Sequence, residues 1–192
     1  YVGERALARE AAGGDAREVH YEGGPVLPGL IDSHNHMLWT GMQRTQADLA
    51  RCRSIAEVLD ALRRYAHANP AREWIASGAG WHVEALAERR YPTRQELDTV
   101  SIDRPIYLPR VGHAAAANSE ALRRAGISRE TPDPAGGRIE RDATGEPTGL
   151  LLEPPAFNLV GRLLPPLTRD ECAEALREVQ KVYLAAGICG VI

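Results

Sequence analysis

The sequence has little that would favour binding to nucleic acid or lipid. Its 23 lysine and arginine residues are outnumbered by 26 acidic residues, and the net charge is −3 with a pI of about 6.1. Such a chain has no basic surface for nucleic acid or an anionic membrane. Aromatic residues make up 5% of the chain, too few for a surface that stacks bases. No apolar run approaches the roughly 20 residues that span a bilayer. We therefore expect a small-molecule substrate and no nucleic-acid or membrane partner, and a homo-oligomer stays possible.

Cysteine is also scarce, and the common phosphate-binding motifs are absent. Cys52, Cys172 and Cys189 are widely separated and odd in number, which argues against a disulfide framework and favours a reducing, cytoplasmic location. Neither GxGxxG nor GxxxxGK[ST] occurs, so no nucleotide fingerprint is present. The chain opens on tyrosine rather than methionine and stops inside an apolar, strand-like run. We expect it to be cut at both ends, so a missing targeting signal carries little meaning.

Helical and strand-like segments alternate along the 192 residues. Strands are expected at 17–24, 26–34, 74–80, 105–110 and 188–192, with a hairpin over 137–152. Capping boxes or caps predict helices that start after Ser54, Thr93, Asn118 and Thr168. Strands separated by helices indicate βαβ units and a parallel sheet. A complete (β/α)8 barrel needs about 250 residues, so this chain would hold about the first four strands of one. A small doubly wound sheet is the alternative, although its phosphate signal is missing.

The stretch PGLIDSHNH, residues 28–36, carries the strongest chemical signal. On a strand, side chains two residues apart lie on the same face, so His34 and His36 would point together, with Asp32 one step earlier. Two such imidazoles can bind one metal ion at about 2.0 to 2.1 Å each. Asp32 could then fix the orientation of a metal ligand without contacting the ion itself. The spacing by itself also fits two solvated histidines at the end of an ordinary strand.

Longer motifs around this stretch resemble those of one enzyme family. VLPGLIDSHNH is similar to the opening strand of the amidohydrolase superfamily, where PG(F/L)IDxHxH carries the first two metal ligands. The whole chain resembles the YtcJ-like amidohydrolases, the group that includes N-substituted formamide deformylase. The matching segments occur in the family's order and cover nearly all of the chain: WIASGAGW (74–81), YPTRQELD (91–98), DRPIYLPRVGHAAAANSEAL (103–122), TPDPAGGRIERDATGEPTGLLLE (131–153) and AAGICGVI (185–192).

The resemblance implies a fold, a cofactor and a reaction. Residues 1–27 would be the tail of an N-terminal β-rich domain, and residues 28–192 would be the N-terminal half of a metal-dependent hydrolase barrel. One or two divalent ions, most simply zinc, would be bound by His34 and His36, and the reaction would be hydrolysis of an N-acyl or amide C–N bond. The other ligands (a lysine, two histidines and an aspartate that is the general base) would lie beyond Ile192, so the fragment itself is expected to be inactive. Lys181, the only lysine, matches none of those positions.

Three further residues are candidates for substrate contact. His113 follows a predicted strand, Trp81 follows a Gly-rich turn, and Glu153 closes the run GLLLE. Each has a plain structural alternative: a satisfied histidine, a core tryptophan and a solvated carboxylate at the end of a hairpin. Two other functions also stay open, namely deamination or lactone hydrolysis on the same metal barrel, and a non-catalytic barrel that has lost the later ligands.

Overall fold

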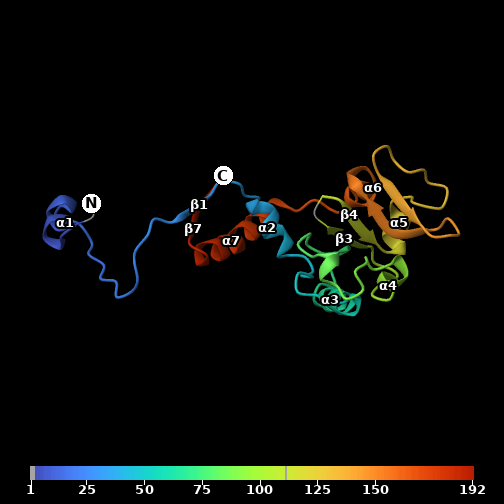
Figure 1. The fold of residues 1–192 in the computed structure, drawn as a ribbon, viewed down its shortest axis with the longest axis horizontal. Helices are drawn as coiled ribbons and strands as arrows, with labels where there is room; N and C mark the ends of the chain where they lie inside the picture. The colour runs from blue at the N-terminus through green and yellow to red at the C-terminus, as the bar shows by residue number, and fades with distance from the viewer. Residues whose placement is uncertain (1–2, 111) are drawn as a thin grey trace.

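The computed structural model describes residues 3–110 and 112–192, so residues 1, 2 and 111 of the segments discussed above lie outside it. Two β-sheets organise the chain. Strands β1 (Leu30–Asp32) and β7 (Ile188–Val191) form a parallel pair, with Leu30 opposite Ile188. Helices α2 (Met37–Gln43) and α7 (Arg169–Ala185) pack together beside this pair (Figure 1). We call these four elements the β1–β7 unit.

The second sheet has five strands in the order β2-β3-β4-β6-β5. Its members are β2 (Ile75–Ala76), β3 (Ile106–Arg110), β4 (Ala114–Ala117), β5 (Arg138–Arg141) and β6 (Pro147–Leu152). Only β2 and β3 run parallel; every other neighbouring pair is antiparallel. The expected parallel arrangement of about four strands is therefore wrong, because the segments 74–80 and 105–110 pair in a different sheet from 30–32 and 188–191.

Helices cover both faces of the five-stranded sheet, as Figure 1 shows. Side chains alternate across β3, so Ile106 and Leu108 pack toward α3 (Ile55–Ala68), whereas Tyr107 packs on the other face. That other face is covered by α5 (Ser119–Arg124) and α6 (Glu153–Gly161). The period of two along a strand thus produces two apolar cores, one on each side of the sheet.

All four expected helix starts are confirmed. Thr93 and Glu96 form a complete capping box at α4 (Arg94–Asp98), and Thr168 and Glu171 form another at α7. Ser54 accepts a hydrogen bond from the Glu57 backbone, and α3 follows. Asn118 accepts one from the Ala121 backbone at the start of α5. These side chains satisfy amide groups that have no partner within the helix, and this is why such short local patterns predict helix starts well.

The N-terminal segment differs from expectation. Residues 17–24 form no strand, and the Val19 and Tyr21 side chains are exposed. A helix, α1 (Arg5–Ala12), precedes them, and an extended stretch leads on to β1 (Figure 1). A strand needs a neighbour for its backbone groups, and none pairs with these residues in the described chain. Assignment of residues 1–27 to a β-rich domain stays a prediction.

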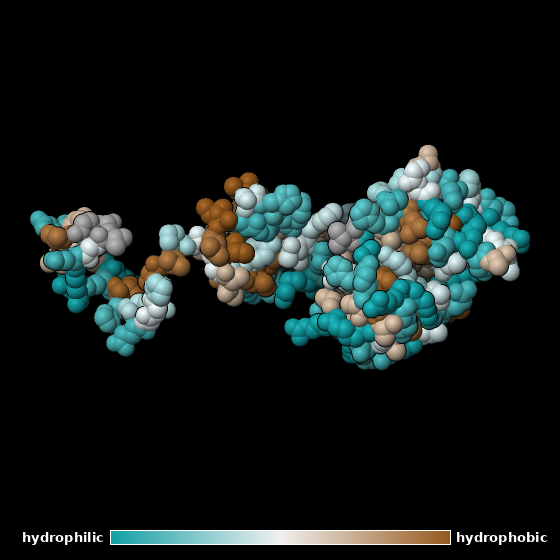
Figure 2. Space-filling view, in the orientation of Figure 1, coloured by the Kyte–Doolittle hydropathy of each residue, from teal (hydrophilic) through white to brown (hydrophobic). Residues whose placement is uncertain are grey.

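Among the described residues, no helix combines the length and the apolar character needed to cross a bilayer. Apolar side chains are nevertheless exposed on the β1–β7 unit, where Figure 2 shows them gathered. They include Leu30, Ile31, Trp39, Leu184 and Ile192. A two-stranded sheet is marginal by itself, and both of its faces normally need cover.

Candidate functional site

The two candidate metal ligands lie in the turn that joins β1 to α2. The strand ends at Asp32, His34 is in a bend, and His36 is the residue that precedes the first turn of α2. Both side chains are exposed, and their ring centroids are 5.1 Å apart with the planes at 83°. The expectation that strand alternation brings them together is therefore wrong, because the turn after the strand does so instead.

The separation of the rings suits a shared metal ion. Two imidazoles that each bind one ion at about 2.0 to 2.1 Å in tetrahedral geometry have ring centroids about 5 Å apart. The described residues contain no cluster of three or more His, Cys, Asp or Glu side chains that could hold a metal. The spacing of His34 and His36 would thus allow two ligands of a metal site, and the described residues bring no third His, Cys, Asp or Glu ligand to them.

Asp32 braces the backbone of this turn. Its carboxylate accepts hydrogen bonds from the His34 backbone N–H at 3.2 Å and from the Asn35 side-chain amide at 2.7 Å. The Asn35 amide and the His34 N–H hold the pKa of Asp32 below its usual range. No hydrogen bond to an imidazole is formed, so the expected orientation of a ligand by Asp32 acts on the main chain of His34 rather than on its ring.

Asn35 links the turn to α7, a role that the sequence patterns missed. The Tyr183 hydroxyl donates to Asn35 Oδ1 at 2.9 Å and lies 3.3 Å from Thr40 Oγ1. The Asn35 backbone N–H donates to the Ile192 carbonyl, and the Ile192 N–H donates to the Asp32 carbonyl. The turn between the two histidines is therefore held on both sides. On a strand, Asn35 would point away from the face that carries the two histidines, and no local sequence pattern marks Tyr183.

Helix α2 packs closely against α7 at Gly41. A Cβ atom at Gly41 would come within 2.7 Å of the Ala175 carbonyl carbon, a contact that side chains do not make. Only glycine lets the two backbones approach so closely. The direction in which α2 leaves His36 therefore depends on Gly41.

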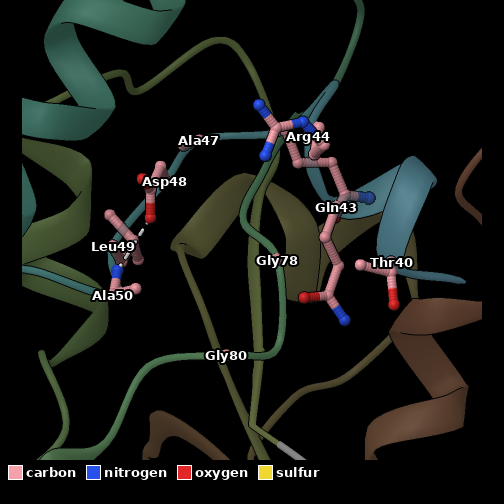
Figure 3. A pocket seen from close by; sticks show the side chains of 10 residues that line it. Thr40, Gln43, Arg44, Ala47, Asp48, Leu49, Ala50, Gly78 and Gly80 are labelled. Atoms are coloured by element: carbon pink, nitrogen blue, oxygen red, sulfur yellow. Dashed lines mark hydrogen bonds between the residues drawn. The ribbon is translucent and has the colours of Figure 1, made fainter. Parts of the chain in front are cut away.

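A pocket of about 310 Å³ lies at the far end of α2 (Figure 3). Its walls come from α2, the segment after it and the Gly-rich turn that follows β2: Thr40, Gln43, Arg44, Gln46, Ala47, Asp48, Leu49, Ala50, Gly78 and Gly80. The Gln43 side chain lies over that turn, and a Cβ at Gly78 would be 3.0 Å from Gln43 Cβ. Gly78 thus makes room for Gln43. The pocket joins the β1–β7 unit to the edge of the five-stranded sheet.

Trp81 is a core residue. Its side chain is 1% exposed, its indole Nε1 donates to the Pro109 carbonyl at 2.9 Å, and its ring meets Tyr91 edge to face. The described chain leaves no indole surface for a substrate, which supports the packing alternative, and substrate contact by Trp81 stays a prediction.

His113 and Glu153, by contrast, are brought together. His113 Nδ1 lies 3.5 Å from Glu153 Oε2, and both side chains are largely open to solvent. The Glu153 backbone N–H donates to the His113 carbonyl at 2.9 Å. Glu153 directly follows β6 and begins α6, and its exposed side chain fits the structural alternative of a solvated carboxylate at the end of the hairpin. Lys181 pairs with Glu178 on the exposed side of α7, in keeping with its exclusion as a ligand.

Comparison with known proteins gives consistent results. The model of the amidohydrolase family (Amidohydro_3) matches residues 17–191. A protein named as an amidohydrolase, YtcJ of Bacillus subtilis (strain 168), is 38% identical over 177 residues, which cover 92% of this chain and 33% of that protein. N-substituted formamide deformylase of Arthrobacter pascens is 37% identical over 196 residues, covering 99% of this chain and 36% of the relative.

A solved structure shares the fold as well. An uncharacterized metal-dependent hydrolase from Pyrococcus furiosus superposes with a TM-score of 0.54 at 25% identity, covering 85% of this chain and 31% of that one. The chain spans about a third of the length of the curated relatives that it matches.

Proposed function

Since this chain belongs to the amidohydrolase family, we propose that it is part of a metal-dependent hydrolase that cleaves an N-acyl or amide C–N bond outside peptides. The observation that carries this proposal is the pair of imidazoles at 5.1 Å in the turn after β1. Their exposure, together with the bracing of the turn by Asp32 and Tyr183, is what a preformed metal site requires.

His34 and His36 would hold one or two divalent ions, of which zinc suits imidazole ligands. Such an ion lowers the pKa of a bound water toward about 7 and polarises the scissile carbonyl. The residues of this chain position the two imidazoles, and the further ligands and the general-base aspartate are proposed to lie outside it. The chain alone is then expected to turn over little or no substrate, because a catalytic zinc usually needs about three protein ligands.

The exposed apolar side chains of the β1–β7 unit support a barrel in the whole protein. We propose that β1 and β7 are neighbouring barrel strands, since they run parallel and a helix precedes β7. Residues 37–168 would then be an insertion between the two strands, and it contains the five-stranded sheet. Further strands and helices would cover the faces that this chain leaves open.

The proposal extends to the kind of substrate and the cellular location. A small-molecule substrate fits a site at strand ends beside a pocket of about 310 Å³. The number and spacing of the three cysteines are the basis for proposing a reducing, cytoplasmic location.

Replacement of both histidines tests the proposed function. In the whole protein, His34→Ala with His36→Ala should abolish bound metal, measured by elemental analysis, and hydrolysis together. His67→Ala, at the exposed end of α3, is the matched control and should change neither. Stoichiometric metal in the double variant would refute the ligand assignment. A panel of N-acyl amines, formamides, lactones and amino-heterocycles separates amide hydrolysis from lactonase or deaminase activity. Bound metal without turnover of any of them would favour a non-catalytic barrel.

A further inference from the structure

One tyrosine hydroxyl reaches the turn that carries the two histidines. Tyr183 is in the last turn of α7, and its hydroxyl donates to Asn35 Oδ1 at 2.9 Å. Asn35 is the residue between His34 and His36. Both Tyr183 and Asn35 are partly buried, and a hydrogen bond is stronger there than on the open surface. The histidine turn is thus held by a residue that lies 148 positions from Asn35 along the chain.

The hydrogen bonds around Asn35 have one arrangement of donors and acceptors. An ionised Asp32 carboxylate only accepts, so the Asn35 amide must turn its NH2 group toward Asp32, where Oδ2 is 2.7 Å away. Asn35 Oδ1 then faces Tyr183 and takes the proton of the phenol. The other oxygen of Asp32 accepts from the His34 backbone N–H at 3.2 Å. The phenol, the amide, the carboxylate and the main chain of His34 therefore form one connected series of hydrogen bonds.

A second path from the same hydroxyl leads to His36. The Tyr183 hydroxyl oxygen lies 3.3 Å from Thr40 Oγ1, and the Thr40 hydroxyl donates to the His36 carbonyl at 3.3 Å. Thr40 is next to Gly41, where α2 packs closely against α7. Both distances exceed that of the bond to Asn35, so this path is the weaker one. Tyr183 is nevertheless connected to the main chain of both histidines.

We propose that Tyr183 is a positioning residue for the two metal ligands and acts through Asn35. An ion binds tightly when both imidazoles already point toward it, because a turn that must first be ordered costs binding free energy. With the hydroxyl in place, Asn35 and Asp32 hold the main chain of His34 in the turn where the imidazole centroids are 5.1 Å apart. Without it, Asn35 Oδ1 loses its donor and the amide can rotate away from Asp32. This inference rests on the metal site of the proposed function, and it assigns part of the metal affinity to α7.

Removal of the hydroxyl alone tests this role in the whole protein. Tyr183→Phe keeps the ring, and it should raise the dissociation constant for zinc, measured by competition with a chelator, about tenfold. Residues that hold a metal ligand in place typically contribute about 10- to 100-fold to metal affinity, and the indirect route through Asn35 favours the lower end of this range.

Tyr65→Phe is the matched control. The Tyr65 hydroxyl also lies in a partly buried place, and it donates to the Thr45 carbonyl at 3.0 Å. The two substitutions should lower the urea midpoint by similar amounts, but only Tyr183→Phe should weaken zinc binding. An unchanged zinc affinity in Tyr183→Phe, or an equal loss of affinity in both variants, would overturn the inference.

A double-mutant cycle tests the route through Asn35. Asn35→Ala should itself weaken zinc binding about tenfold or more, since it removes the side-chain bonds to both Tyr183 and Asp32. Adding Tyr183→Phe to Asn35→Ala should then change the dissociation constant by less than about twofold, because only the weaker path through Thr40 remains. Additive effects of the two substitutions would show that Tyr183 does not act through Asn35.

Zinc binding and hydrolysis together separate this inference from the proposed function. If Tyr183→Phe weakens zinc binding in a protein that hydrolyses no amide, the positioning role stands and the proposed hydrolysis fails. If Tyr183→Phe leaves zinc affinity unchanged while His34→Ala with His36→Ala abolishes zinc binding and hydrolysis, the proposed function stands and the positioning role is wrong.

Discussion

The strained backbone at Glu153 predicts that glycine and alanine exchange their usual order of stability. Glu153→Gly and Glu153→Ala both remove the carboxylate and its contact with His113, so the difference between them reports the backbone alone. A left-handed conformation costs a residue with a Cβ roughly 1 to 2 kcal/mol. Glycine loses about 0.5 to 1 kcal/mol more conformational entropy than alanine on folding. At a φ of 65°, the glycine variant should therefore be the more stable by about 0.5 to 1 kcal/mol.

Urea unfolding of the 192-residue chain, followed by circular dichroism, measures this difference from the two midpoints. Asp60 provides the matched control, because it lies on the exposed side of α3, which packs on the same sheet. There alanine should exceed glycine by about 1 kcal/mol, as in any exposed helix interior. If the alanine variant were also the more stable one at position 153, the backbone at Glu153 would not be strained.

Two further predictions concern the close approach of α2 to α7 and the partly exposed ion pair between Arg90 and Glu96 of α4. Gly41→Ala should lower the free energy of unfolding by about 1 to 3 kcal/mol, because the added Cβ would press on the Ala175 backbone. Gly24→Ala is the control in the same urea assay, since a Cβ there meets nothing within 4 Å. Equal effects of the two substitutions would contradict the packing argument. Glu96→Gln should cost about 1 kcal/mol near pH 7, because the Arg90 guanidinium lowers the pKa of Glu96 from 4.5 to about 2. A carboxyl group with a lowered pKa in the folded state stabilises the fold above pH 4.5, and this stabilisation is lost as the pH falls toward 2. The urea midpoints of the wild type and of Glu96→Gln should therefore converge over that interval. A constant gap between the midpoints would contradict the stabilising role of the Arg90–Glu96 ion pair.

Local structure was predictable wherever a few adjacent residues determine it. The pairs Thr93 with Glu96 and Thr168 with Glu171 form the expected capping boxes. Asn118 caps its helix, and the hairpin over 137–152 forms as β5 and β6. In each case the partner atoms are within a few residues of one another, so the sequence contains both halves of the interaction.

Several elements escaped prediction because their stability comes from distant contacts. Four alanines form β4, although alanine is depleted in strands, because β3 and β6 pair on its two sides and it is fully covered. Because β4 pairs antiparallel with both β3 and β6, the sheet is mixed rather than parallel. Helix α2 contains a glycine in its interior and still forms, since α7 packs against it.

For the site, the sequence alone determined the chemical groups: two imidazoles separated by one residue, a nearby carboxylate, and a family whose members use such groups for hydrolysis. The tertiary structure decided which of these groups meet. It moved the histidines from a strand face to a turn, and it tied Asn35 to a tyrosine 148 positions away. It also buried Trp81 and placed Glu153 against His113. Residue types and short spacings are written in the chain, whereas contacts between distant segments arise only when burial of apolar surface selects one packing of the whole chain.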